Sequence, residues 1–156
     1  MLIRRPLFLA VIAVAAVSLT SIAAIAVAAE TPFKGTVNAD ETVVPSPPTA
    51  SLTRDGTGTD TYLGRYTEHI VMTINLPTLS STGTATFTAA NGNTLTATVI
   101  GQATRTGPTS LSIVEVYTVI GGTGRFADAT GNFALNSNVD QVTGVSSGTL
   151  SGAIDK

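Results

Sequence analysis

The sequence predicts an all-β fold, an eight-stranded antiparallel β-barrel, preceded by a cleavable leader. Three observations support this fold class. Threonine, a β-branched residue that favours strands, occurs 26 times in residues 30–156. Apolar and polar residues alternate with period two, and no window has the i, i+3, i+4, i+7 spacing of an amphipathic helix. Gly, Pro and Asn interrupt the alternation at short intervals, as in antiparallel all-β domains.

The first thirty residues differ from the rest of the chain. A short positive start with Arg4 and Arg5 precedes a long apolar run that ends in small residues at 26–29. This order is typical of a secretory signal peptide, and we expect cleavage after Ala28 or Ala29. An uncleaved transmembrane anchor is the alternative, since about 20 apolar residues can span a bilayer. We therefore expect residues 1–29 to be a signal peptide. Residues 30–156 would form a single secreted β-barrel domain with no membrane contact after cleavage.

Eight segments carry the strand pattern. They are residues 33–43, 51–62, 65–76, 83–89, 94–99, 110–120, 133–139 and 146–154. The proline run at 45–48 cannot join a central ladder, so we expect a loop or a sheet edge there. Eight strands can close into a barrel whose interior holds side chains or one small ligand, and closure removes exposed edges. A sandwich is the alternative architecture.

An Asn-Gly dipeptide between the fourth and fifth of these segments is the clearest hairpin signal. A two-residue turn would place Thr88 opposite Leu95 and mix the two faces of the sheet. A three-residue loop at 90–92 instead pairs Phe87 with Leu95, so that each face keeps one kind of side chain. We predict the three-residue loop, with Gly92 in the left-handed conformation.

Composition excludes several functional classes. Charged residues make up 12% of the chain, against about 25% in an average domain, and Lys and Arg are not clustered, so we expect no nucleic-acid partner. The absence of Cys excludes disulfide scaffolds, zinc fingers and thiol enzymes. His69, the one histidine, has outward parity in its strand and no second His or Cys to share a zinc ion. We therefore expect no metal and no cofactor.

Residues 120–131 read Ile-Gly-Gly-Thr-Gly-Arg-Phe-Ala-Asp-Ala-Thr-Gly. This segment resembles the GGTGxFxxAxG turn of the allene oxide cyclase and dirigent barrels. Segments 59–66 and 86–92 also resemble a bacterial exported group with this barrel-like domain, and the similarity covers about residues 33–154. The resemblance implies an eight-stranded barrel with an apolar lumen and, as in the plant members, a homo-oligomer such as a trimer.

The resemblance also implies activities of two kinds. The plant cyclases close a ring in a fatty-acid epoxide, and dirigent proteins orient aromatic radicals for coupling. The cavity cysteine of the cyclase has no counterpart here, and the dirigent acid and arginine positions do not align by motif. No catalytic residue is therefore carried over.

The glycine-rich turn at 121–124 has a structural interpretation of its own. Its glycines permit positive φ without steric cost. We expect a short helical turn at 125–129, with Phe126 closing one end of the barrel. A phosphate-binding loop is the alternative, but the Gly-Lys-Ser/Thr of a P-loop is missing.

Two carboxylic acids are candidate catalytic groups. Glu68 has the parity of Ile70 and Met72, and Glu115 has the parity of Tyr117, which points both acids into the lumen. There they could form an acid–base pair or bind a polar ligand group, and an apolar lumen would raise their pKa values. The alternative is a place at a barrel mouth, solvated or paired with an arginine: Arg65, Arg105 or Arg125.

Three functions remain after these exclusions. The leading one is an exported barrel that binds a small apolar or amphipathic molecule, since ligand pockets are mostly apolar with few polar groups. The second is a cyclase-like or isomerase-like enzyme that positions a reactive lipid or aromatic substrate. The third is a structural or surface-interaction protein with a packed barrel; ice binding by outward Thr rows is disfavoured because barrels twist. The candidate ligand-binding residues are Tyr66, Met72, Phe87 and Tyr117.

Overall fold

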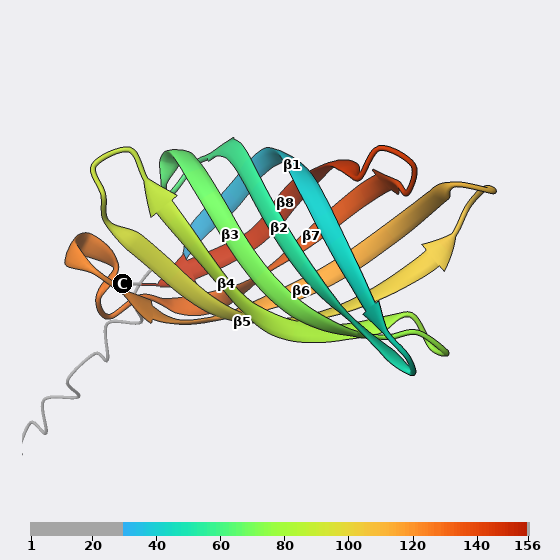
Figure 1. Ribbon diagram of the computed structural model, residues 1–156. Helices are drawn as coiled ribbons and strands as arrows, with labels where there is room; N and C mark the ends of the chain where they lie inside the picture. Colours follow the sequence, from blue (N-terminus) through green and yellow to red (C-terminus); the bar gives the residue numbers. More distant parts are fainter. Residues whose placement is uncertain (1–29, 156) are drawn as a thin grey trace, which may run out of the picture.

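Eight antiparallel strands, each hydrogen-bonded to the next in chain order, close into a barrel when β8 pairs with β1 (Figure 1). The computed structural model describes residues 30–155, so the expected signal peptide lies outside the described residues. The eight-stranded antiparallel barrel is confirmed, and the sandwich alternative is wrong. The strands are β1 (Thr31–Ser46), β2 (Thr49–Asp60), β3 (Gly64–Asn75), β4 (Ser80–Ala89), β5 (Thr94–Arg105), β6 (Ser110–Gly122), β7 (Thr130–Asp140) and β8 (Val145–Asp155), with a 3₁₀ turn, η1 (Gly124–Phe126), before β7.

The β4–β5 hairpin has the predicted register. Phe87 lies opposite Leu95 and both are buried, while Thr86 lies opposite Thr96 on the outer face. The loop spans residues 90–92, because the N–H of Ala89 donates to the carbonyl of Asn93 at 2.9 Å. Gly92 has φ +83°, which confirms the left-handed conformation. Keeping apolar side chains on the inner face and threonines on the outer face was therefore sufficient to select the loop length.

The first hairpin extends beyond the closed wall. Pairing between β1 and β8 stops at Asp40 opposite Val145, whereas β1 stays paired with β2 as far as Ser46 opposite Thr49. The N–H of Glu41 still donates to the carbonyl of Gly144 at 2.7 Å, so the free edge of β1 spans residues 42–46. Pro45, which has no N–H to donate, lies in this stretch, so the proline run is at a sheet edge as expected.

The two ends of the barrel differ. One end, here called the closed end, carries η1, the β2–β3 and β4–β5 turns and the described chain ends (Figure 1). Phe126 in η1 is fully buried there, with its ring centroid 5.2 Å from that of Tyr62. Phe126 thus closes this end as expected, although the helical turn begins one residue earlier than predicted. The other end, here called the open end, carries the remaining turns.

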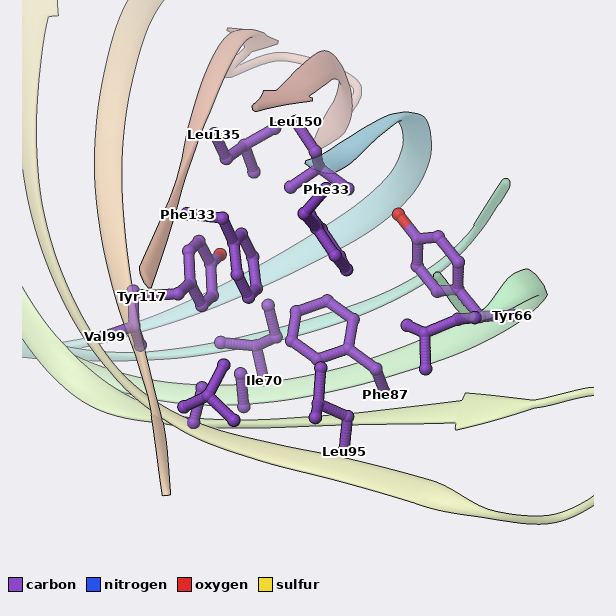
Figure 2. Packing of buried hydrophobic residues seen from close by; sticks show 14 of the residues in the cluster. Phe33, Tyr66, Ile70, Phe87, Leu95, Val99, Tyr117, Phe133, Leu135 and Leu150 are labelled. Carbon is purple, nitrogen blue, oxygen red and sulfur yellow. The ribbon is translucent and has the colours of Figure 1, made fainter. Parts of the chain in front are cut away.

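Aromatic rings fill the half of the interior nearer the closed end (Figure 2). Tyr117 stacks on Phe133 with ring centroids 4.7 Å apart, and Phe33 stacks on the same ring at 4.3 Å. Phe87 meets Phe133 and Tyr117 edge-on. Because Phe33 and Phe87 are 0% exposed and interiors are close-packed, this half of the barrel is a packed core.

We expect Gly92→Ala to destabilise the protein by about 1 kcal/mol, because an L side chain resists the positive φ of this residue. A Cβ at this position would have no neighbour within 4 Å, so the cost is one of backbone strain alone. Urea denaturation measures it.

Gly107→Ala is the matched control. A Cβ at Gly107 would make only an ordinary contact, 3.6 Å from Ser110, and its backbone is not in the left-handed region. Equal stability losses in the two variants would contradict the assigned loop geometry.

Candidate functional site

A cavity of about 320 Å³ occupies the half of the barrel nearer the open end. Its walls are mostly apolar, and Glu41 and Glu115 are among the residues that line its floor. The interior is therefore divided into a packed half and a hollow half. The side chains that line the cavity include Leu52, Met72, Ile74, Leu76, Leu79, Leu111, Ile113 and Val139, with Arg105 and Gln141 near the mouth.

The floor of this cavity rests on a buried charge cluster centred on Arg54, whose side chain is 1% exposed. Nε of Arg54 donates to Oε1 of Glu68 at 3.0 Å. Nη1 and Nη2 donate to the two carboxylate oxygens of Glu115 at 3.1 and 2.8 Å, a bidentate pair. Because β2, β3 and β6 each supply one partner, the guanidinium joins strands on different sides of the barrel.

Tyr117 connects the charge cluster to the aromatic core. Its hydroxyl accepts a hydrogen bond from Nη2 of Arg54 and donates one to Oε2 of Glu115. Its ring stacks on Phe133. The aromatic half thus holds the phenol in place, and the phenol in turn orients the Arg54–Glu115 pair.

Glu41 on β1 is the fourth member of the cluster. Its side chain is 4% exposed, and its Oε1 lies 3.7 Å from Nη1 of Arg54, an ion contact longer than a hydrogen bond. Oε1 of Glu41 and Oε2 of Glu68 are buried and accept no hydrogen bond. The cluster therefore gathers three carboxyl groups around one guanidinium.

Burial and charge shift the acidities in this cluster. Burial would lower the pKa of Arg54, but Tyr117 and the two glutamates that it contacts raise that pKa well above its ordinary value, so the guanidinium stays charged. Burial raises the pKa of Glu41, an effect that Arg54 and Ser146 offset only in part. Burial likewise raises the pKa of Glu68 and of the Tyr117 phenol. The cluster thus favours protons on its surplus carboxyl groups.

Strand parity placed the two candidate acids correctly but not their partner. Glu68 and Glu115 point inward and are 3% and 2% exposed. The alternative position at a mouth is wrong, because both pair with Arg54 in the interior. Each of the three arginines suggested for that alternative lies elsewhere. Arg65 is exposed, Arg105 contacts Gln141 at the mouth, and Arg125 lies over the ring of Phe126 at the closed end.

Two residues of the site were missed by the sequence interpretation. Arg54 shares the parity of Leu52 in β2, and Glu41 shares the parity of Ala39 in β1. That parity was the available signal.

The four predicted ligand-binding residues all point inward, at different depths. Met72 lines the cavity, whereas Phe87 and the ring of Tyr117 lie in the packed half. Tyr66 is also in that half, where its ring meets Phe87 edge-on. The binding role of these residues stays a prediction. His69 is on the outer face as expected, 2.7 Å from Asp55.

Two further features concern residues 30–155 only. Within this range no three His, Cys, Asp or Glu side chains gather in a way that could hold a metal ion. No helix in the same range has the length and apolar character needed to cross a membrane.

Comparison with solved structures finds a protein of similar architecture. The structure of a pterocarpan synthase dirigent protein matches 90% of this chain and 95% of that chain, with a TM-score of 0.56 and 17% sequence identity. The chain has the dirigent barrel fold. At this identity the likeness shows the fold alone, and it confirms the resemblance seen in the glycine turn at 120–131. No model of a known protein family matches the sequence, and no curated protein matches it.

We expect Arg54→Met to lower the free energy of unfolding by about 3–5 kcal/mol, because it leaves buried carboxyl groups without their cation. Urea denaturation measures the loss. The triple variant Arg54→Met/Glu68→Leu/Glu115→Leu removes the paired charges together and should regain most of that stability. A triple variant no more stable than Arg54→Met would contradict this account of the cluster.

We expect the folded protein to lose stability with rising pH through Glu41 and Glu68. Their folded pKa values lie above the ordinary 4.5, so between these values the folded state binds more protons than the unfolded state. The stabilising contribution is complete below the unfolded pKa and disappears as the pH rises through the folded pKa.

Glu41→Gln should therefore flatten the decline of the melting temperature as the pH rises above the ordinary carboxyl pKa of 4.5. Asp40→Asn, which changes an exposed carboxylate on the same strand, is the control. Parallel curves for wild type and Glu41→Gln would show that Glu41 does not titrate in this way.

Proposed function

We propose that this protein is an exported β-barrel that binds a small apolar or amphipathic molecule in the cavity at its open end. The observation that carries the proposal is the hollow half of the barrel, about 320 Å³ of space with apolar walls. Ligand sites in proteins range from about 300 to 1,000 Å³ and combine apolar walls with a few polar groups. A barrel with only a structural role would be expected to fill this volume with side chains, as the closed-end half does.

The leader supports export. Residues 1–29 have the positive start, apolar run and small-residue exit of a signal peptide. An exported barrel meets its ligand outside the cytoplasm, and this chain builds its pocket without any cysteine.

Among the predicted ligand-binding residues, we assign direct contact to Met72. Its flexible thioether is suited to an apolar ligand of irregular shape. Phe87, Tyr66 and Tyr117 have a supporting part in this proposal, since they pack behind the charge cluster on which the cavity rests. A ligand would reach the Arg54 cluster through the carboxyl groups of Glu41 and Glu115, which line the cavity.

A second candidate function is a cyclase-like or isomerase-like reaction in the same cavity. The observation in its favour is a carboxyl group with a raised pKa, that of Glu41, on the wall of an apolar pocket. A neutral carboxylic acid there could donate a proton to a bound substrate. Of the two acids expected from the sequence, Glu115 lines the cavity, while Glu68 is paired with Arg54 and is not among the lining residues. Turnover of a bound molecule that stops in Glu41→Gln would select this function.

Binding can be tested with Nile red, a neutral apolar fluorophore. We expect saturable binding to the wild-type protein and loss of that binding in Ala103→Trp, because Ala103 lines the cavity and an indole there would fill it. Thr104→Trp is the matched control, since the neighbouring side chain is exposed on the outer face. Fluorescence titration gives the affinity, and the melting temperature confirms that both variants fold.

Two results would contradict the proposal. If the wild-type protein takes up no apolar probe, the packed-barrel function replaces it. If Ala103→Trp and Thr104→Trp bind Nile red equally well, the binding site is not this cavity.

A further inference from the structure

The charge cluster has fewer hydrogen-bond donors than acceptors. A guanidinium has five N–H donors. Arg54 uses four of them, on Glu68, on both oxygens of Glu115 and on Tyr117. One N–H is left for two buried oxygens that accept nothing, Oε1 of Glu41 and Oε2 of Glu68. These acceptors are therefore satisfied only by a proton on one of the carboxyl groups or by a donor from outside the cluster.

The cluster is also short of positive charge. Among the basic side chains of residues 30–155, Arg54 alone is buried, and it is surrounded by the carboxyl groups of Glu41, Glu68 and Glu115. The bidentate bond to Glu115 matches one carboxylate to the guanidinium. No second cation is available inside the barrel for Glu41 or Glu68.

Glu41 presents this deficit to the cavity. The side chain of Glu41 is only 4% exposed. Glu41 lines the hollow half of the barrel, whereas Glu68 is not among the lining residues. The groups around its carboxyl are Arg54 on β2, Glu68 on β3, Glu115 on β6 and Ser146 on β8. A ligand in the cavity can therefore reach Glu41 without disturbing the Arg54–Glu115 pair.

We propose that the cavity binds an organic amine, with the ammonium group on the carboxylate of Glu41 and the apolar body against Met72 and its neighbours. This inference rests on the proposed function and names the class of its ligand. An ammonium supplies both missing quantities, N–H donors and positive charge. On binding, the carboxyl proton of Glu41 leaves to solvent, the carboxylate pairs with the ammonium, and no covalent bond is made or broken.

Other ligand classes fit the floor less well. A ketone or ether could accept a hydrogen bond from a protonated Glu41, but it brings neither an N–H donor nor a positive charge to the cluster. A carboxylate would add a negative charge beside three carboxyl groups and would have only Arg105, at the mouth, as a counter-ion. An alcohol supplies a donor but no charge, which makes it the informative comparison.

The test is displacement of Nile red by octylamine, octanol and octanoate at neutral pH. These compounds share one apolar chain and differ only in the head group. We expect octylamine to bind wild-type protein about tenfold more tightly than octanol, since hydrogen bonds to charged groups contribute more than neutral ones. In Glu41→Gln the tenfold preference for octylamine over octanol should be lost. Asp40→Asn, on the outer face of the same strand, should keep the wild-type preference.

Each contrary result has a distinct meaning. Equal affinities of octylamine and octanol in the wild type, or a preference that persists in Glu41→Gln, would overturn the inference and leave the proposed function standing. Tightest binding of octanoate would also overturn it and would make Arg105 the anchor. If neither Nile red nor any octyl compound binds, the proposed function fails, and this inference fails with it.

Discussion

The need to neutralise buried carboxyl groups around Arg54 constrains the whole interior. Arg54 and Glu68 lie on the neighbouring strands β2 and β3, whereas Glu115 lies on β6, 61 residues further along the chain than Arg54. The Arg54–Glu115 contact therefore holds only if the barrel closes in this register. An unpaired buried charge costs several kcal/mol, so a slipped strand would be penalised well beyond its lost backbone bonds. The cluster also separates the aromatic half of the lumen from the hollow half. The pocket therefore exists because a polar layer limits how far the hydrophobic core can extend.

Much of the fold could be predicted because alternation and turn chemistry are local. The loop at 90–92 follows from keeping Phe87 opposite Leu95, and the proline run marks a free edge. The length of β5 could not be found in this way. It continues past Val99 to Arg105 although the apolar alternation fades, because its hydrogen bonds come from β4 and β6. Strand ends of this kind are set by neighbouring strands, which a local pattern does not contain.

The site was predictable only in part, for a related reason. Parity shows that Glu68 and Glu115 face the lumen, but it does not show what they meet across the barrel. The pairing of Glu68 with Arg54 depends on the register of β2 against β3. The pairing of Glu115 with Arg54 depends on closure and stagger, which are properties of the whole sheet. The division of the lumen is equally non-local. It arises because rings such as Phe133 fill one half, while the aliphatic side chains around Ala103 leave space between them in the other.

Because the barrel has an even number of antiparallel strands, β1 begins and β8 ends at the same end of the barrel. Thr31 pairs with Ile154 at the closed end, so any segment that precedes β1 or follows β8 departs from the side opposite the cavity mouth. Attachment through either terminus, whether to a purification tag, a solid support or a fusion partner, leaves the mouth facing away from the attachment point. The closed end of the barrel is thus the attachment end, and immobilised protein keeps its pocket open to the surrounding solution.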